Sequence, residues 1–108
     1  MGLKQLLSKE GIEGIDRSGS LLLDYESLLQ ALDVLAKKNV RALGVESFHM
    51  RDMYLIPDID MIVDVSEANS VLESVATIRE IVTRHHDGAR LYELVSEVDS
   101  PDEVDSRD

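Results

Sequence analysis

Two acidic residues, Asp58 and Asp60, stand one residue apart in a segment rich in aliphatic side chains. On a β-strand such a pair leaves the same face, with the two side chains roughly 7 Å apart. Converging carboxylates suit Mg²⁺, which prefers oxygen ligands and often combines one or two carboxylates with substrate phosphates. The sequence therefore predicts a candidate magnesium site at this pair. The alternative is that Asp58 only turns the chain after Pro57, while Asp60 is solvated.

Ser47 precedes this pair, with ten residues between it and Asp58. The spacing resembles the Gly-Ser-x10-Asp-x-Asp signature of the nucleotidyltransferase superfamily, especially its minimal members. Residues 57–65 are similar to the aspartate-bearing strand of that family, and Glu93 stands where its third acidic residue falls. The resemblance extends over residues 24–98, in the order of the expected elements as well as in the motif.

The resemblance implies a role for each of these side chains. Asp58, Asp60 and Glu93 would hold Mg²⁺ and carry out catalysis, with Glu93 as a third ligand or as the general base. Ser47 and Arg51 would bind the nucleotide. We therefore expect the three carboxylates and Ser47 to converge. The residues taken alone also allow simpler roles, because Ser47 can end a strand and Glu93 can be a solvent-facing strand residue.

The Gly-Ser turn departs from the family pattern. Glu46 stands where the family has glycine, whose small size lets backbone N–H groups approach a triphosphate closely. A carboxylate there adds bulk and charge beside a polyanion, and like charges about 4 Å apart repel by about 4 kcal/mol at a dielectric constant of about 20. His49 and Met50 replace the small residue and the arginine that follow in the family, and Arg51 comes one place later. The sequence thus predicts a degenerate member, with the fold kept and catalysis weakened or lost.

The pattern of apolar residues predicts the elements that must position these side chains. Helices are expected over residues 24–39 and 70–86, and strands over residues 40–45, 58–65 and 89–98. Asp24 is a good N-cap for the first helix, and Ser70 and Glu73 have capping-box spacing at the second. The pattern over residues 46–57 is irregular, and residues 53–57 are either a short strand or part of a long connecting loop. This order predicts the α+β class, an α/β sandwich in which two main helices pack on a small mixed sheet, with a nucleotidyltransferase-like arrangement.

Length and composition predict a single domain. The chain has 108 residues, of which 44% are hydrophobic, enough for one core. A short helix and a loop are expected over residues 1–23, where glycines interrupt any longer helix. The main domain is expected over residues 24–98. Residues 99–108 are acidic and poor in apolar side chains, which predicts a disordered tail.

Charge restricts the partners that the chain can bind. The sequence holds 22 acidic and 11 basic residues, a formal net charge of −11 at pH 7. This excess argues against direct binding of nucleic acid or of an anionic membrane surface, and it favours a basic partner protein. The chain has no cysteine. No run of apolar residues approaches the length of a membrane-spanning helix, which is about 20 residues. We therefore expect a cytoplasmic protein.

Three classes of function remain open, one of which is a stand-alone structural domain whose Asp-x-Asp spacing arises by chance. The resemblance implies a nucleotidyltransferase-like protein, with a nucleoside triphosphate and Mg²⁺ as ligands if it is active. Such proteins often serve as the antitoxin of a HEPN-type toxin. The alternative is a non-enzymatic acidic immunity or inhibitor protein that binds a basic partner protein by charge complementarity. The sequence also leaves open whether the chain forms a homodimer.

Overall fold

A computed structural model describes residues 2–17, 20–87 and 90–99, without the side chains of residues 59, 60 and 99. Its elements are, in chain order, the helix α1 (Leu3–Lys9), the strands β1 (Ile15–Arg17) and β2 (Ser20–Leu22), the helix α2 (Tyr25–Lys38), the strands β3 (Ala42–Arg51) and β4 (Tyr54–Asp64), the helix α3 (Val71–His85), the strand β5 (Arg90–Ser96) and a 3-10 helix (Glu97–Asp99). The α+β class predicted from the sequence is therefore confirmed.

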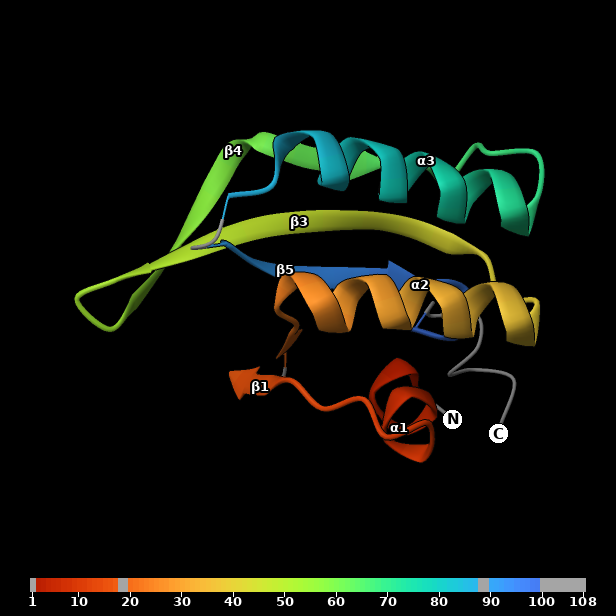
Figure 1. Ribbon diagram of the computed structural model, residues 1–108, viewed down its shortest axis with the longest axis horizontal. Coiled ribbons are helices and arrows are strands. Elements are labelled where there is room, and N and C mark those ends of the chain that lie inside the picture. The colour runs from red at the N-terminus through yellow and green to blue at the C-terminus, as the bar shows by residue number, and fades with distance from the viewer. Residues whose placement is uncertain (1, 18–19, 88–89, 100–108) are drawn as a thin grey trace.

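The helices α2 and α3 lie side by side on one face of a sheet formed by β4, β3 and β5 (Figure 1). Both predicted N-caps are confirmed. The Asp24 carboxylate accepts a hydrogen bond of 2.8 Å from the Ser27 N–H, and the Ser70 hydroxyl accepts one of 3.0 Å from the Glu73 N–H. The Glu73 carboxylate also accepts a hydrogen bond of 2.7 Å from the Asn69 N–H, which completes a reciprocal cap at the start of α3.

The sheet has the strand order β4-β3-β5, and both of its strand pairs are antiparallel. The mixed sheet predicted from the sequence is therefore wrong. The strands β3 and β4 are joined by only two residues, Asp52 and Met53, whose φ angles of 51° and 70° are typical of a tight hairpin turn. Such a turn connects antiparallel strands only. Residues 46–57, where only residues 53–57 were expected as a possible short strand, form the turn of this hairpin and the adjoining parts of both strands.

The core lies between the sheet and the two long helices. Val45 of β3 and Tyr92 and Leu94 of β5 point toward the helices and are buried. They pack in one cluster with apolar residues of α2 and α3, among them Leu28, Leu32, Leu35, Ile78 and Val82. The alternate positions of the strands face away from both helices.

The first 23 residues contribute to the same core. The expected short helix is α1, and its Leu3 and Leu7 are buried in the core cluster together with Ile12. Where a loop was expected, β1 and β2 form a small antiparallel hairpin. Leu23 then bridges to Tyr92 of β5. The predicted acidic tail lies outside the described residues, except for the backbone of Asp99 in the 3-10 helix.

No helix in the described ranges is long and apolar enough to cross a membrane.

Candidate functional site

The strand β4 carries a bulge at the Asp-x-Asp motif. The register between β3 and β4 shifts between Glu46 and Phe48, so that residues 58–61 of β4 lie opposite Ser47 alone. The inserted residues break the alternation that a regular strand would have. Asp58 directly follows Pro57, which pairs with Phe48, so alternation along β4 turns its side chain toward the face of the sheet on which Ser47 is buried.

Four polar side chains meet at this bulge, and we call them the Asp58 cluster: Ser47 and His49 from β3, Asp58 from β4 and Arg90 from β5. The Ser47 hydroxyl lies 2.6 Å from Oδ2 of Asp58, and Nδ1 of His49 lies 2.7 Å from Oδ1. Nη1 of Arg90 lies 3.5 Å from Oδ2 of Asp58 and 3.5 Å from the Ser47 hydroxyl oxygen. The cluster therefore ties all three strands of the sheet together.

The carboxyl group of Asp58 is only 10% exposed, yet its surroundings favour the ionised form. Burial by itself raises its pKa, but the hydrogen bonds from Ser47 and His49 and the charge of Arg90 outweigh this effect and lower the pKa below 3.8. An ionised carboxylate only accepts hydrogen bonds, so Nδ1 of His49 must be the donor. In the neutral form of His49 this leaves Nε2 as the acceptor.

This geometry limits the chemistry that the cluster can perform. An aspartate that orients a histidine is an arrangement used in general-base catalysis. The Ser47 hydroxyl, however, donates to Asp58 and not to His49, so the cluster lacks the hydrogen bond that joins a nucleophile to its base. Within the described residues, no group of three or more His, Asp or Glu side chains is placed to hold a metal ion.

The structure brings together only part of the site expected from the sequence. Ser47 and Asp58 are in direct contact. Asp60 lies in β4, but its side chain is outside the described part of the structure. Glu93 of β5 pairs with Glu46, one residue away from the pair formed by Ser47 and Tyr92, and it therefore faces the opposite side of the sheet. Arg51 is exposed at the end of the β3–β4 hairpin.

Two members of the cluster, His49 and Arg90, were not among the residues predicted for the site. His49 follows Ser47 by two positions, so a period of two along β3 could have placed both side chains on one face. Arg90 offered no comparable signal, because its approach depends on the register between β3 and β5, which pairs it with His49.

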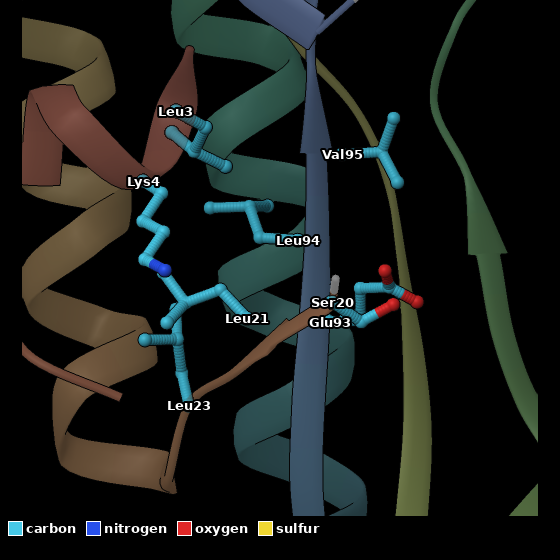
Figure 2. Close-up of a pocket in the computed structure, with 8 residues that line it drawn as sticks. All are labelled: Leu3, Lys4, Ser20, Leu21, Leu23, Glu93, Leu94 and Val95. Atoms are coloured by element: carbon cyan, nitrogen blue, oxygen red, sulfur yellow. The ribbon is translucent and has the colours of Figure 1, made fainter. Parts of the chain in front are cut away.

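A second candidate surface lies on the other side of the sheet, away from α2 and α3. We call it the open face. Three rows of residues cross it from β4 through β3 to β5: Asp64, Gly44 and Val95; Ile62, Glu46 and Glu93; Pro57, Phe48 and Leu91. Ile62 is 58% exposed and Val95 is 39% exposed. Figure 2 shows Glu93 and Val95 on one side of β5 and Leu94 on the other.

The open face combines a hollow with negative charge. A cavity of about 310 Å³ lies over Gly44, which has no side chain, and Ile62 and Val95 are among the residues that line it. Glu46 and Asp64 also line this cavity, and Glu93 lies directly opposite Glu46. Hydrogen bonds from the Ser66 hydroxyl and N–H lower the pKa of Asp64 and keep it ionised.

Glu46 and Glu93 stand out because no cation among the described residues balances them. Side chains directly opposite each other on antiparallel strands have Cβ atoms about 4.5–5.5 Å apart, and like charges there are destabilising. Neither glutamate forms an ion pair within the part of the chain that the structure describes. The nine positions of the open face include no lysine or arginine.

Comparisons of the chain with protein-family models, with curated proteins and with solved structures found no match.

Proposed function

We propose that the chain is a non-enzymatic acidic protein that binds a basic partner protein through its open face. The observation that carries this proposal is the cross-strand pair of Glu46 and Glu93, which has no balancing cation in the described chain and lies among exposed apolar side chains. The net charge of −11 adds a long-range attraction for a basic partner.

The physical argument concerns what the pair does to the fold and what a partner would change. Two carboxylates placed opposite each other cost stability in the unbound chain. A lysine or arginine of a partner would relieve that repulsion, and its aliphatic stem could lie on Ile62 and Val95 while its charged group reaches the carboxylates. The surface thus suits a partner that presents basic side chains.

The proposal is tested by NMR titration with a blocked basic peptide, acetyl-Lys-Val-Lys-Val-Lys-amide, as the probe. We expect amide shifts at Gly44, Ile62 and Val95. The double variant Glu46→Gln/Glu93→Gln should weaken binding by about fivefold or more, because it removes both carboxylates that attract the cation.

The matched control is Glu26→Gln/Glu80→Gln, which removes the same charge from two exposed positions on α2 and α3, on the other side of the sheet. It should change the affinity by less than about twofold, since distant surface charges are largely screened in salt. If both double variants weaken binding equally, the attraction is general and the open face is not the site.

A second candidate function rests on the contact between Ser47 and Asp58. We infer that, if the chain is a nucleotidyltransferase-like protein of the kind the sequence resembles, these two side chains would stand at its nucleotide site, with Mg²⁺ held in part by Asp58. Its partner would then be a toxin of the HEPN type. Calorimetric titration with ATP, with and without Mg²⁺, tests this candidate. Magnesium-dependent heat that Asp58→Ala/Asp60→Ala abolishes would support it, and no heat at millimolar ATP would exclude nucleotide binding.

We also propose that the chain acts in the cytoplasm. A chain without cysteine fits a compartment in which disulfides do not form. Fractionation of cells that express the full chain tests this, and recovery in a membrane or secreted fraction would contradict it.

A further inference from the structure

At its outer edge, β5 forms a single bridge with the segment that follows β2, and no continuous ladder. Leu23 and Tyr92 exchange two hydrogen bonds, of 2.7 Å and 2.8 Å, across an isolated bridge. Peptide groups alternate in direction along a strand, so those of Leu94 point to the same edge as those of Tyr92. The ladder does not continue to Leu94, whose outward N–H and C=O have no strand partner in the described ranges.

A hollow of about 270 Å³ lies at this edge (Figure 2). It is lined by Leu3 and Lys4 of α1, Ser20, Leu21 and Leu23 in and beside β2, and Glu93, Leu94 and Val95 of β5. Four of these residues are leucines, so the lining is mainly apolar on the side of Leu94. The Glu93 carboxylate stands on the other side of the strand.

A strand edge with an unpaired backbone position beside an apolar hollow has the features of a peptide-binding site. An extended peptide that adds to a sheet gains affinity from main-chain hydrogen bonds and specificity from pockets for alternate side chains. Here the residue opposite Leu94 would direct its side chain to the leucine-lined side, and its two neighbours would direct theirs to the side of Glu93. The edge therefore fits a segment in which apolar and basic residues alternate.

We propose that the outer edge of β5 at Leu94 binds an extended segment of the partner protein, with an apolar side chain in the hollow and a neighbouring lysine or arginine at Glu93. This inference rests on the proposed function for the choice of a basic partner, because Glu93 belongs both to the open face and to the hollow. It adds the mode of binding, which is the addition of a strand.

The test compares two peptide probes on the full chain by NMR. The first is acetyl-Lys-Val-Lys-Val-Lys-amide, and the second is the same peptide with both valines N-methylated, which removes their N–H donors and keeps every charge. We expect the first probe to shift the amide signals of Leu21 and Leu94. The methylated probe should bind this edge about fivefold or more weakly, because it cannot complete the ladder.

A variant that fills the hollow gives an independent readout. Leu21→Trp should weaken binding of the first probe at Leu94 by about fivefold or more, since the added ring occupies the space for the apolar side chain. Leu72→Trp, at an exposed position of α3, is the matched control and should leave binding unchanged.

The outcomes separate this inference from the proposed function. Shifts at Gly44 and Ile62 that methylation leaves intact, with none at Leu94, would overturn the added strand and leave the open face supported. Shifts at Leu94 that methylation does not weaken would also overturn it. The absence of shifts at both sites would overturn both proposals.

Discussion

The carboxyl group of Asp58 accepts hydrogen bonds from Ser47 and His49 and forms an ion pair with Arg90. A carboxylate has about four lone-pair positions, so these two hydrogen bonds take up about half of its capacity. A metal ion at Asp58 would have to compete with the Arg90 guanidinium for the same oxygen atom. The Asp58 cluster links β3, β4 and β5. The spacing of the Asp-x-Asp motif did not indicate this structural role.

This role predicts a pH-dependent contribution to stability. The folded-state pKa of Asp58 lies below the ordinary value of 3.8, so its stabilisation is fully present above pH 3.8 and is lost as the pH falls through the lowered value. Asp58→Asn should reduce the free energy of unfolding at pH 7 by about 1–3 kcal/mol, because His49 and Arg90 both lose the charged carboxylate beside them, although Arg90 keeps its ion pair with Asp87. Urea denaturation at a series of pH values measures this difference, which should shrink below pH 3.8.

The control for this prediction is Asp33→Asn, which removes an exposed ion pair with Arg79. Exposed pairs contribute about 0–1 kcal/mol, so its effect should be small at every pH. A deficit of Asp58→Asn that stays constant down to pH 2 would show that the shape of the new side chain, and not the lost charge, destabilises the fold.

The close approach of β3 and β4 depends on Gly44. A Cβ atom at this position would lie 2.5 Å from the Val63 carbonyl oxygen, which belongs to the backbone and cannot rotate away. Gly44→Ala should therefore reduce the free energy of unfolding by about 1–3 kcal/mol. Urea denaturation measures the loss, and hydrogen exchange at Val45 and Val63 should show faster opening of this strand pair.

Gln30→Ala serves as the comparison, because Gln30 is exposed on α2 and alanine is a good helix former. Its effect should stay within about 0.5 kcal/mol. If Gly44→Ala is equally mild, β4 moves aside without loss, and the hollow over this position is not set by the glycine.

The sequence predicted the helices better than the strands, and the structure explains why. Helix ends depend on local caps, and Asp24 and Ser70 make the hydrogen bonds that their types suggest. The bulge at Asp58 depends instead on the register with β3, which no local pattern of residues 58–65 contains. Glu93 was expected beside Asp58 but lies on the other side of the sheet for the same reason. The pairing of a strand decides which side of the sheet each of its side chains occupies.

The hairpin of β3 and β4 also lacked a clear pattern in the sequence. Its far end extends beyond α2 and α3 (Figure 1), and Met50, Met53 and Tyr54 there are exposed. With neither face covered by a helix, the apolar and polar residues need not alternate. The Ser47–Asp58 contact was foreseeable only through the family resemblance, whereas the open face required the register of all three strands.

The charge of the whole chain acts on folding and on binding in opposite ways. A net charge of −11 on a chain of 108 residues repels itself in the folded state, and salt screens this repulsion. The Debye length falls from about 30 Å at 0.01 M salt to about 8 Å at 0.15 M. We therefore expect the melting temperature to rise by a few degrees over this range, since about 1 kcal/mol corresponds to about 4–8 °C in a domain of this size.

Binding of the basic peptide should weaken over the same range of salt, because the attraction between Glu46, Glu93 and the lysines is screened. Thermal denaturation and peptide titration on the same samples would measure both trends. The opposite signs matter, because a partner held by apolar contacts alone would bind equally well or better as salt increases. If peptide binding strengthens with salt while the melting temperature rises, apolar contacts in the leucine-lined hollow dominate binding. Glu46 and Glu93 would then contribute little to it.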